Sequence, residues 1–579
     1  MGVFITLKTA AGSWTEVVHP IAASPEQLQG EVQEVNDAIA PTIQGMNPQK
    51  QADVDVKIAS RCADAPHLAR VVSRLVLLAG AAAAQLPLYA HVRSLLADTL
   101  ASQVGGIPPI STSSSYTIPV PCVSLVNGAQ LSGVASTSLP CAELLLAAPK
   151  AQSAAHGVGA ILRAHARATQ ALAQATNAPC RFGAAGGLLL PRTTALPLPD
   201  IPAPVGESGG PHLPQGSSAG ADALVAATQW ALLAMCIPGS QGGDAVEEAP
   251  PAASLDASLA LVLHGLGEWA HLDSETDAPA SSPRGSGRSK GKGKKAPPKK
   301  APAKKGGAKG KKGGAAPTEG PVLVEVEEEG TEKYNLNVAD TLAEEGEVEE
   351  VSAPMLHQLY HALAAEVPCM ALVQPYAAGD KHAYAHTAAA TLRRPVPGTS
   401  RSEAAGASED APCTLRSTDA PLVLVSDSSD GVTALAQTWC KEHLMHGLLL
   451  HTSSYSNMTG LIEAASSCIR GGVPLHLRHD EQGAAVLGTP VWKAPTPASA
   501  LVQTPFLVEL AMAMNAVSVQ LCAPSTAAAA HELGKLTDLE ASVPNCVWAG
   551  KLLATQQAAA EEFAVQRMQA AREDTESKK

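Results

Sequence analysis

The stretch IPVPCVSLVNG, residues 118–128, decides the fold predicted for this chain. It carries the first of a series of short apolar runs, at 120–126, and similar runs recur through the rest of the sequence. They lie at 258–263, 367–373, 421–427, 446–452, 473–479 and 516–522. Helical patterns separate most of them, for example at 154–175 and 503–516. Strands that alternate with helices over this length predict a parallel α/β barrel.

The sequence before this stretch predicts a different pattern of secondary structure. Residues 3–8 and 14–19 flank a short turn and predict a hairpin, and residues 25–104 follow helical periodicity with a break near Pro87. The apolar run 75–84 is too short to span a bilayer and predicts a buried helix. We therefore expect a small α+β domain over 1–115, followed by the barrel over 116–553.

Three stretches interrupt the barrel pattern and are interpreted as surface insertions. They cover 192–220, rich in Pro, Gly and Ser; 271–322, which is low in complexity and becomes Lys-rich; and 395–420, which is polar. Residues 554–579 predict an exposed C-terminal helical tail with a charged end. The eleven cysteines include no CxxC pair, which fits a reducing, cytoplasmic compartment.

Charge is unevenly distributed along the chain. The net formal charge is 41 − 54 = −13, but residues 284–312 hold eleven Lys and two Arg and no acid. Gly and Pro within this segment oppose helix formation, so we expect a disordered polycation that binds an acidic polymer, such as the acidic tails of tubulin, or pairs with the chain's own acidic stretches. Nucleic acid is the less favoured partner, because no aromatic residues interleave the lysines. The lysines are Lys290, Lys292, Lys294, Lys295, Lys299, Lys300, Lys304, Lys305, Lys309, Lys311 and Lys312.

Several motifs, in order, resemble those of the enolase family. They are IPVPCVSLVNGAQLSG (118–133), FGAAGG (182–187), EKYNLNV (332–338), FLVELAMAMNAVSVQLCAP (506–524) and LEASVPNCVWAGK (539–551). The resemblance covers roughly 1–553 apart from the insertions. It implies the enolase fold, in which a small N-terminal α+β domain precedes a TIM-like β/α barrel. It is nearest to a divergent branch of that family associated with sperm and cilia.

The resemblance also implies a metal site that this chain has largely lost. Enolases hold Mg²⁺ with three carboxylates at the ends of barrel strands, and the matching positions here are Leu263, Val373 and Asp427. One remaining acid does not supply the several hard oxygens that Mg²⁺ needs. We therefore expect no metal and no other cofactor.

The catalytic positions that the resemblance implies are mostly replaced as well. The two active-site lysines match His451 and Gln520, and the acid of the glycine loop matches Ala185. The substrate-loop histidine matches Leu131, and the histidine before the retained arginine matches Leu477. Remnants of the site are Glu143, Arg478 and the serine of a mobile substrate loop, Ser24.

These replacements predict a non-catalytic, enolase-like protein, a pseudoenzyme. The resemblance implies a structural scaffold or adaptor in the ciliary or flagellar axoneme, with other axonemal or microtubule-associated proteins as partners and no membrane association. Whether the chain forms an enolase-type homodimer stays open. Two alternatives also stay open: a phosphopyruvate hydratase with residual or altered activity, and a nucleic-acid-associated protein that binds through its basic segment.

Overall fold

The computed structural model describes a large part of the chain in separate stretches. They are residues 3–18, 24–62, 65–103, 115–128, 139, 141–177, 179–183, 185–190, 219–237, 254–265, 271–272, 333–336, 350–377, 379–389, 421–427, 432–478 and 506–559. Residues Met1–Leu272 and Glu332–Lys579 belong to one unit, and Asp273–Thr331 forms a second. All of the Lys-rich segment, the proposed insertion at 395–420 and nearly all of that at 192–220 lie outside the described residues, as does the tail beyond 559.

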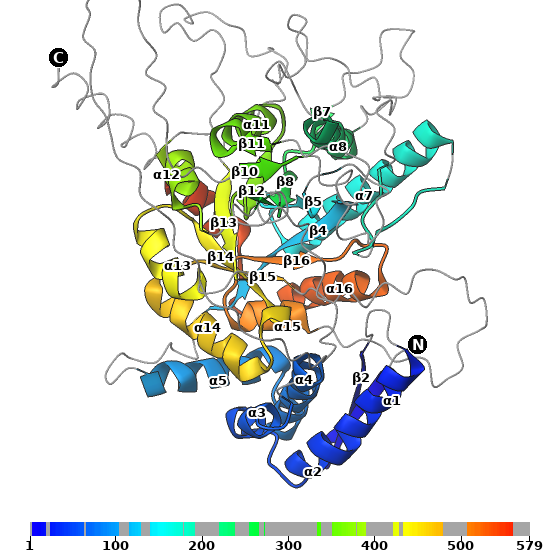
Figure 1. Ribbon diagram of the computed structural model, residues 1–579, viewed down its shortest axis with the longest axis vertical. Coiled ribbons are helices and arrows are strands. Elements are labelled where there is room, and N and C mark those ends of the chain that lie inside the picture. The colour runs from blue at the N-terminus through cyan, green and yellow to red at the C-terminus, as the bar shows by residue number, and fades with distance from the viewer. Residues whose placement is uncertain are drawn as a thin grey trace, which may run out of the picture. The chain divides into compact units, whose positions relative to one another are not determined.

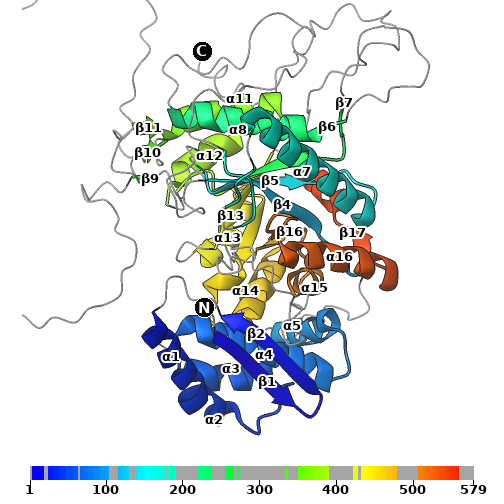
Figure 2. The same cartoon turned by 90° about the vertical axis from the view of Figure 1, so that its right-hand side faces the viewer.

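The N-terminal part begins with a hairpin and continues with helices, as the sequence pattern predicts (Figure 2). Strands β1 (Val3–Thr9) and β2 (Gly12–Val18) pair in antiparallel register. The elements that follow are α1 (Pro25–Gln33), a π-helical turn (Glu34–Ile39), α2 (Ala40–Ile43), α3 (Gln51–Ala59), α4 (Pro66–Ala83) and α5 (Leu88–Gln103). Buried side chains of β1, α3 and α4, among them Ile5, Ile58 and Leu75, form a core of their own.

Helix α4 contains part of the apolar run that the sequence singles out. Its length and composition would allow it to cross a membrane, but 67% of its 18-residue window is buried inside the protein. A mostly buried core helix passes the same test of length and composition. Its apolar residues are divided between the N-terminal core, which contains Leu75, and the barrel core, which contains Leu77 and Ala81, so packing inside the protein accounts for them.

Eight strands form a closed barrel in the order β12-β13-β14-β15-β16-β4-β5-β8 (Figure 1). Their bounds are β4 (Val120–Asn127), β5 (Glu143–Ala147), β8 (Ala260–His264), β12 (Cys369–Val373), β13 (Leu422–Ser426), β14 (Gly447–His451), β15 (Leu475–Arg478) and β16 (Ser518–Leu521). Seven of them correspond to the seven apolar runs. The expectation of an all-parallel barrel is wrong at β5, which the sequence analysis missed and which pairs antiparallel with both β4 and β8.

Helices cover the outside of the barrel (Figures 1 and 2). They are α7 (Ala154–Thr176), α8 (Ala219–Met235), α11 (Ala353–Glu366), α12 (Lys381–Ala389), α13 (Val432–Lys441), α14 (Met458–Gly471), α15 (Leu507–Ala513) and α16 (Ala527–Ser542). Residues 550–559 are also helical. The 3₁₀ turn Thr452–Ser454 joins β14 to the loop before α14.

Short strands complete the described structure. Strand β3 (Thr117–Ile118) pairs with β17 (Val547–Trp548), and β6 (Cys236–Ile237) pairs with β7 (Ser254–Leu255). Strands β9 (His271–Leu272), β10 (Lys333–Asn335) and β11 (Glu350–Ser352) form a three-stranded sheet. The first two residues of the proposed 271–322 insertion therefore belong to a sheet, because β9 pairs with β10.

Buried and half-buried polar groups join the N-terminal helices to the barrel. The Asp55 carboxylate accepts hydrogen bonds from the backbone N–H and the hydroxyl of Thr459 at 3.0 and 2.6 Å. The Ser73 hydroxyl accepts from the N–H of Met458 at 2.9 Å, so α3 and α4 together cap the first turn of α14. The Arg70 guanidinium donates to the carbonyl oxygen of Tyr455 at 2.8 Å. We call this set of contacts the joint.

Candidate functional site

One rim of the barrel collects five of the polar residues predicted from the sequence, namely Glu143, Asp427, His451, Arg478 and Gln520. Seven strands run in one direction, so their C-terminal ends meet at the same rim. Because β5 runs the other way, its first residue, Glu143, also lies at this rim, opposite Asn127 of β4 and His264 of β8. The antiparallel strand therefore brings a carboxylate to the end of the barrel at which barrel enzymes place their sites.

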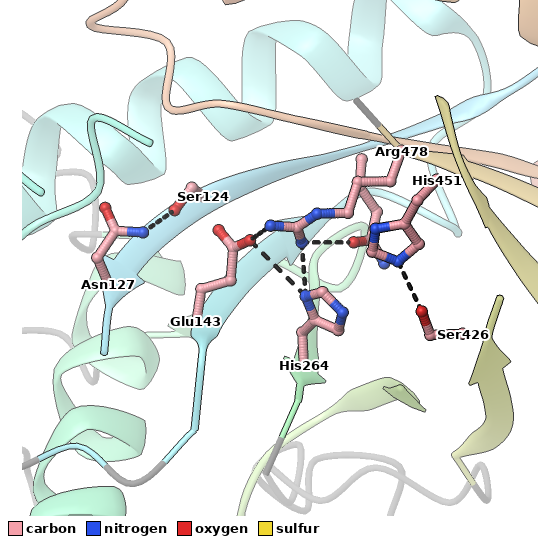
Figure 3. A network of polar contacts seen from close by, with 8 residues as sticks. Ser124, Asn127, Glu143, His264, Ser426, His451 and Arg478 are labelled. Carbon is pink, nitrogen blue, oxygen red and sulfur yellow. Dashed lines mark hydrogen bonds and ion pairs between the residues drawn. The ribbon is translucent and has the colours of Figure 1, made fainter. Parts of the chain in front are cut away.

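We call the interior of the barrel at this rim the barrel mouth. It contains a buried ion pair. Arg478, the last residue of β15, forms an ion pair with Glu143 of β5, although three strand-to-strand steps separate these strands in the barrel (Figure 3). The same guanidinium donates to Nδ1 of His264, and it donates to Oε1 of Gln520 on β16 at 3.0 Å. Arg478 is 7% exposed and Glu143 is 2% exposed, so water solvates neither charge fully.

The ion pair shifts the ionisation of its members. Burial is the largest single influence and would raise the pKa of Glu143, but the guanidinium of Arg478, together with the contacts of His264 and Ser124, lowers that pKa to about 2. Burial, reinforced by the charge of Arg478, lowers the pKa of His264 to about 4. At neutral pH the mouth therefore holds a carboxylate, a guanidinium and a neutral imidazole.

A second contact lies beside the ion pair. The Ser426 hydroxyl, at the end of β13, lies 2.8 Å from Nε2 of His451 at the end of β14 (Figure 3). Asp427 follows Ser426, and its Oδ1 accepts from the backbone N–H of His451 at 2.8 Å and from the hydroxyl of Ser454 at 3.4 Å. These bonds use the Asp427 carboxylate to fix the start of the loop after β14.

Some buried polar atoms of the mouth have no partner among the described residues. They are Nε2 of His264, Nε2 of Gln520 and Oδ1 of Asn127. The amide nitrogen of Asn127 donates to the Ser124 hydroxyl at 3.2 Å (Figure 3). One layer deeper, Nδ1 of His476 lies 2.7 Å from the Ser518 hydroxyl, and burial lowers the pKa of His476 to about 3.

The glycine loop packs directly on the first barrel strand. A Cβ atom on Gly187 would lie 2.6 Å from both Asn127 Oδ1 and Ser124 Oγ, and one on Gly183 would lie 2.8 Å from Asn127. Gly186 has φ +72°, and a Cβ there would lie 2.5 Å from Thr526. The backbone oxygen of Ala185 accepts from the N–H of Ala523 at 2.7 Å. The glycines are thus explained by close approach and backbone conformation alone.

The structure brings together part of the residue set predicted from the sequence. Glu143, Arg478, His451 and Gln520 lie in the mouth, and Asp427 lies at its edge. Val373 faces the same way as its strand partner His264. Leu263 and Leu477 are buried on the opposite face of their strands from His264 and Arg478. Leu131 and the eleven lysines lie outside the described residues.

Ser24 has a local structural role away from the barrel strands. Its hydroxyl accepts from the N–H of Gln27 at 3.3 Å, and Oε1 of Gln27 accepts from the N–H of Ser24 at 2.8 Å. This reciprocal capping box begins α1.

The sequence analysis missed His264 and Ser426. His264 directly follows Leu263, which was matched to a metal ligand, so a shift of one residue would have moved the match onto the residue that faces the barrel interior. Alternation along the run 258–263, extended by one residue, carried that signal.

The donor set of the mouth does not fit Mg²⁺. The Glu143 carboxylate is paired with a guanidinium, and one Asp427 oxygen accepts from a backbone N–H, whereas Mg²⁺ favours free carboxylates in octahedral geometry. Within the described stretches, no three His, Cys, Asp or Glu side chains are grouped so that they could hold a metal ion.

Comparison with known proteins assigns no family to the chain, so its class is defined by its fold alone. No protein-family model matches the sequence, and no curated protein matches it. The described structure defines a mixed α/β protein with an eight-stranded closed barrel, compatible with a TIM-like barrel.

Proposed function

We propose that this chain is a non-catalytic, enolase-like protein that serves as a structural scaffold or adaptor in a large assembly, the axoneme of cilia and flagella. The proposal joins the order of the enolase-like motifs to the chemistry of the barrel mouth. The cilium enters through the resemblance to the sperm- and cilia-associated branch.

The positions of the motifs support the enolase-like part of the proposal. FGAAGG packs on Ser124 and Asn127, which belong to the segment IPVPCVSLVNG. The segment 506–524 forms α15 and β16, and β16 pairs with β4, the strand of that same segment. Motifs hundreds of residues apart thus meet around one strand, as motifs that share a site must.

One observation carries the non-catalytic part. The carboxylate of Glu143 is paired with Arg478, and Arg478 also donates to Gln520, so both charges of this ion pair are satisfied within the mouth. Enolase chemistry needs a strong base and metal ions to stabilise an enediolate. Here His451, at a lysine position, is hydrogen-bonded to Ser426, and Gln520, at the other, has no basic group.

The activity part is tested by assaying the purified full chain for magnesium-dependent conversion of 2-phosphoglycerate. We expect no turnover above that of an Arg478→Ala variant. Turnover that depends on Mg²⁺ and is lost in the variant would support the alternative of a phosphopyruvate hydratase and contradict the pseudoenzyme.

The location is tested separately, by extracting ciliary axonemes with detergent and then with salt. We expect a tagged copy to stay in the detergent-resistant fraction. A copy that is wholly detergent-soluble would contradict the scaffold role in cilia while leaving the absence of catalysis untouched.

The basic segment is proposed to bind acidic protein tails. Deletion of 284–314 should abolish salt-sensitive co-sedimentation with microtubules, because many lysines act together through weak, screened contacts. Microtubules stripped of their acidic tails serve as the control. Stronger binding to duplex DNA than to microtubules would favour the nucleic-acid alternative.

A further inference from the structure

We propose that the barrel mouth is a built receptor for a guanidinium group, and that the side chain of Arg478 is its resident, intramolecular occupant. The receptor consists of the Glu143 carboxylate, Oε1 of Gln520 and Nδ1 of His264. This inference rests on the geometry of the mouth and holds whether or not the barrel carries out a reaction.

Three acceptors from three strands converge on one cation. Glu143 lies at the start of β5, His264 at the end of β8 and Gln520 within β16, while the guanidinium arrives from β15. The order β15-β16-β4-β5-β8 shows that the side chain reaches past β16 and β4 to its carboxylate. Arg478 therefore extends across the barrel interior and binds residues beyond the neighbouring strand (Figure 3).

The chemistry of the acceptors suits a planar, multiply donating cation. A guanidinium offers five N–H donors in a fixed fork and cannot accept a hydrogen bond. It uses one terminal nitrogen for Glu143 and the other for both Gln520 and His264. A lysine ammonium or a metal ion would present a point charge without this fork.

The contacts of Arg478 also determine the tautomer of His264 and the amide orientation of Gln520. Because Arg478 can only donate, Nδ1 of His264 must be the unprotonated nitrogen, and the ring proton lies on Nε2. For the same reason the oxygen of Gln520 faces the guanidinium, which leaves its amide nitrogen without a partner among the described residues. The 3.7 Å between His264 Nδ1 and Glu143 Oε1 is too long for a direct hydrogen bond.

Removing the occupant and supplying its head group tests the proposal. Arg478→Ala should lower the thermal unfolding temperature of the full chain, and millimolar ethylguanidinium should raise it again at pH 8, where His264 stays neutral. Ethylammonium at the same concentration controls for charge without the planar fork. The wild type, whose receptor is filled, should gain no more from ethylguanidinium than from ethylammonium.

The double variant Arg478→Ala with Glu143→Gln removes the anion of the receptor and should lose the rescue. Equal stabilisation of the single variant by both cations, or equal rescue in the double variant, would overturn the proposal. The assay measures binding and not turnover, so its outcome is independent of the enolase assay.

A measurement on the wild type keeps the proposal testable if Arg478→Ala does not fold. Nitrogen NMR of histidine-labelled protein, with the His264 signal assigned from a His264→Gln spectrum, should show the Nε2–H tautomer at neutral pH. An Nδ1–H tautomer would contradict the receptor, because it would set a donor against a donor.

Discussion

The joint and the barrel mouth both hold charged side chains that are buried or, in the case of Arg70, half-buried, but they satisfy them in different ways. In the joint, Asp55 accepts from a helix N-terminus and Arg70 donates to a backbone carbonyl. In the mouth, Glu143 and Arg478 pair with each other and with neutral side chains. The joint thus uses charge to complete a backbone that needs partners in any case, whereas each charge of the mouth depends on its counterpart.

This difference has an energetic consequence. Backbone groups at a helix terminus can find water or a 3₁₀ bond when a cap is lost. A buried charge whose counterion is lost has no such substitute, because desolvation exceeds what a neutral environment returns. A single substitution in the mouth is therefore expected to lower the unfolding free energy by more than one in the joint. A double substitution that removes both charges of the mouth should cost less than the sum of the two single substitutions.

The largest effect is expected when one partner of the mouth is neutralised. Glu143→Gln keeps the shape of the side chain and leaves Arg478 buried without a counterion, which should destabilise the protein by about 3–5 kcal/mol. The measurement is the urea unfolding free energy. The variant with Glu143→Leu and Arg478→Met should lie closer to the wild type than Glu143→Gln does. If the double variant is less stable than Glu143→Gln, the two charges do not depend on each other in the way proposed here.

Acid should weaken the mouth in two steps. The pKa of His264 is lowered by burial to about 4 from an ordinary value of 6.5, so the unfolded chain takes up this proton first, and stability is lost as pH falls from 6.5 toward 4. The pKa of Glu143 is held at about 2, below its ordinary 4.5, so its contribution is present above pH 4.5 and is lost toward pH 2.

Other buried histidines titrate in the upper window, so the test is a difference between two proteins. Unfolding free energy is measured against pH for the wild type and for His264→Asn. Between pH 6.5 and 4 the variant should lose less stability than the wild type does. Parallel curves over that window would show that His264 is not held neutral by its position.

In the joint, Asp55→Ala removes the acceptor for two hydrogen bonds from Thr459. Hydrogen bonds to charged groups contribute about 1.5–3 kcal/mol each, and water can replace part of them, so we expect a loss of about 2 kcal/mol in unfolding free energy. Asp55→Asn keeps an oxygen acceptor and is expected to lose less. A loss as large as that of Glu143→Gln would remove the distinction between the two regions.

Sequence reasoning found the barrel from its periodic strands and missed the strand that shapes the mouth. Each of the seven predicted runs became a strand because apolar residues fully buried in a parallel barrel form continuous runs. Strand β5, ELLLA, has the same apolar character, but no predicted helix separates it from β4. The reversal of direction depends on the connection after β4 and not on the composition of the strand.

The site was predictable where it depended on single positions and not where it depended on contacts. Arg478 and Glu143 were each identified as remnants, but nothing in one sequence indicates that they pair across the barrel. Ser24 was predicted to belong to a substrate loop, and that stays a prediction. Its immediate context, Ser-x-x-Gln with a proline after the serine, also carried the signal of the capping box that the structure contains.

The smallest expected effect concerns two glycines with nearly the same backbone. Gly186 has φ +72° and lies in the glycine loop beside the mouth, and Gly472 has φ +70° at the end of α14. Alanine is strained at both, by about 1 kcal/mol in this left-handed region. A Cβ on Gly472 meets nothing within 4 Å, whereas one on Gly186 lies 2.5 Å from Thr526.

Gly186→Ala should therefore lower the unfolding free energy by more than Gly472→Ala, and the added replacement Thr526→Ser should recover part of that difference by removing the methyl group it would meet. Ser at 526 retains a hydroxyl for the cap of α16, so the recovery is not offset by a lost cap. Equal losses at the two glycines would mean that the glycine loop moves away from Thr526, the N-cap of α16, at little cost in free energy.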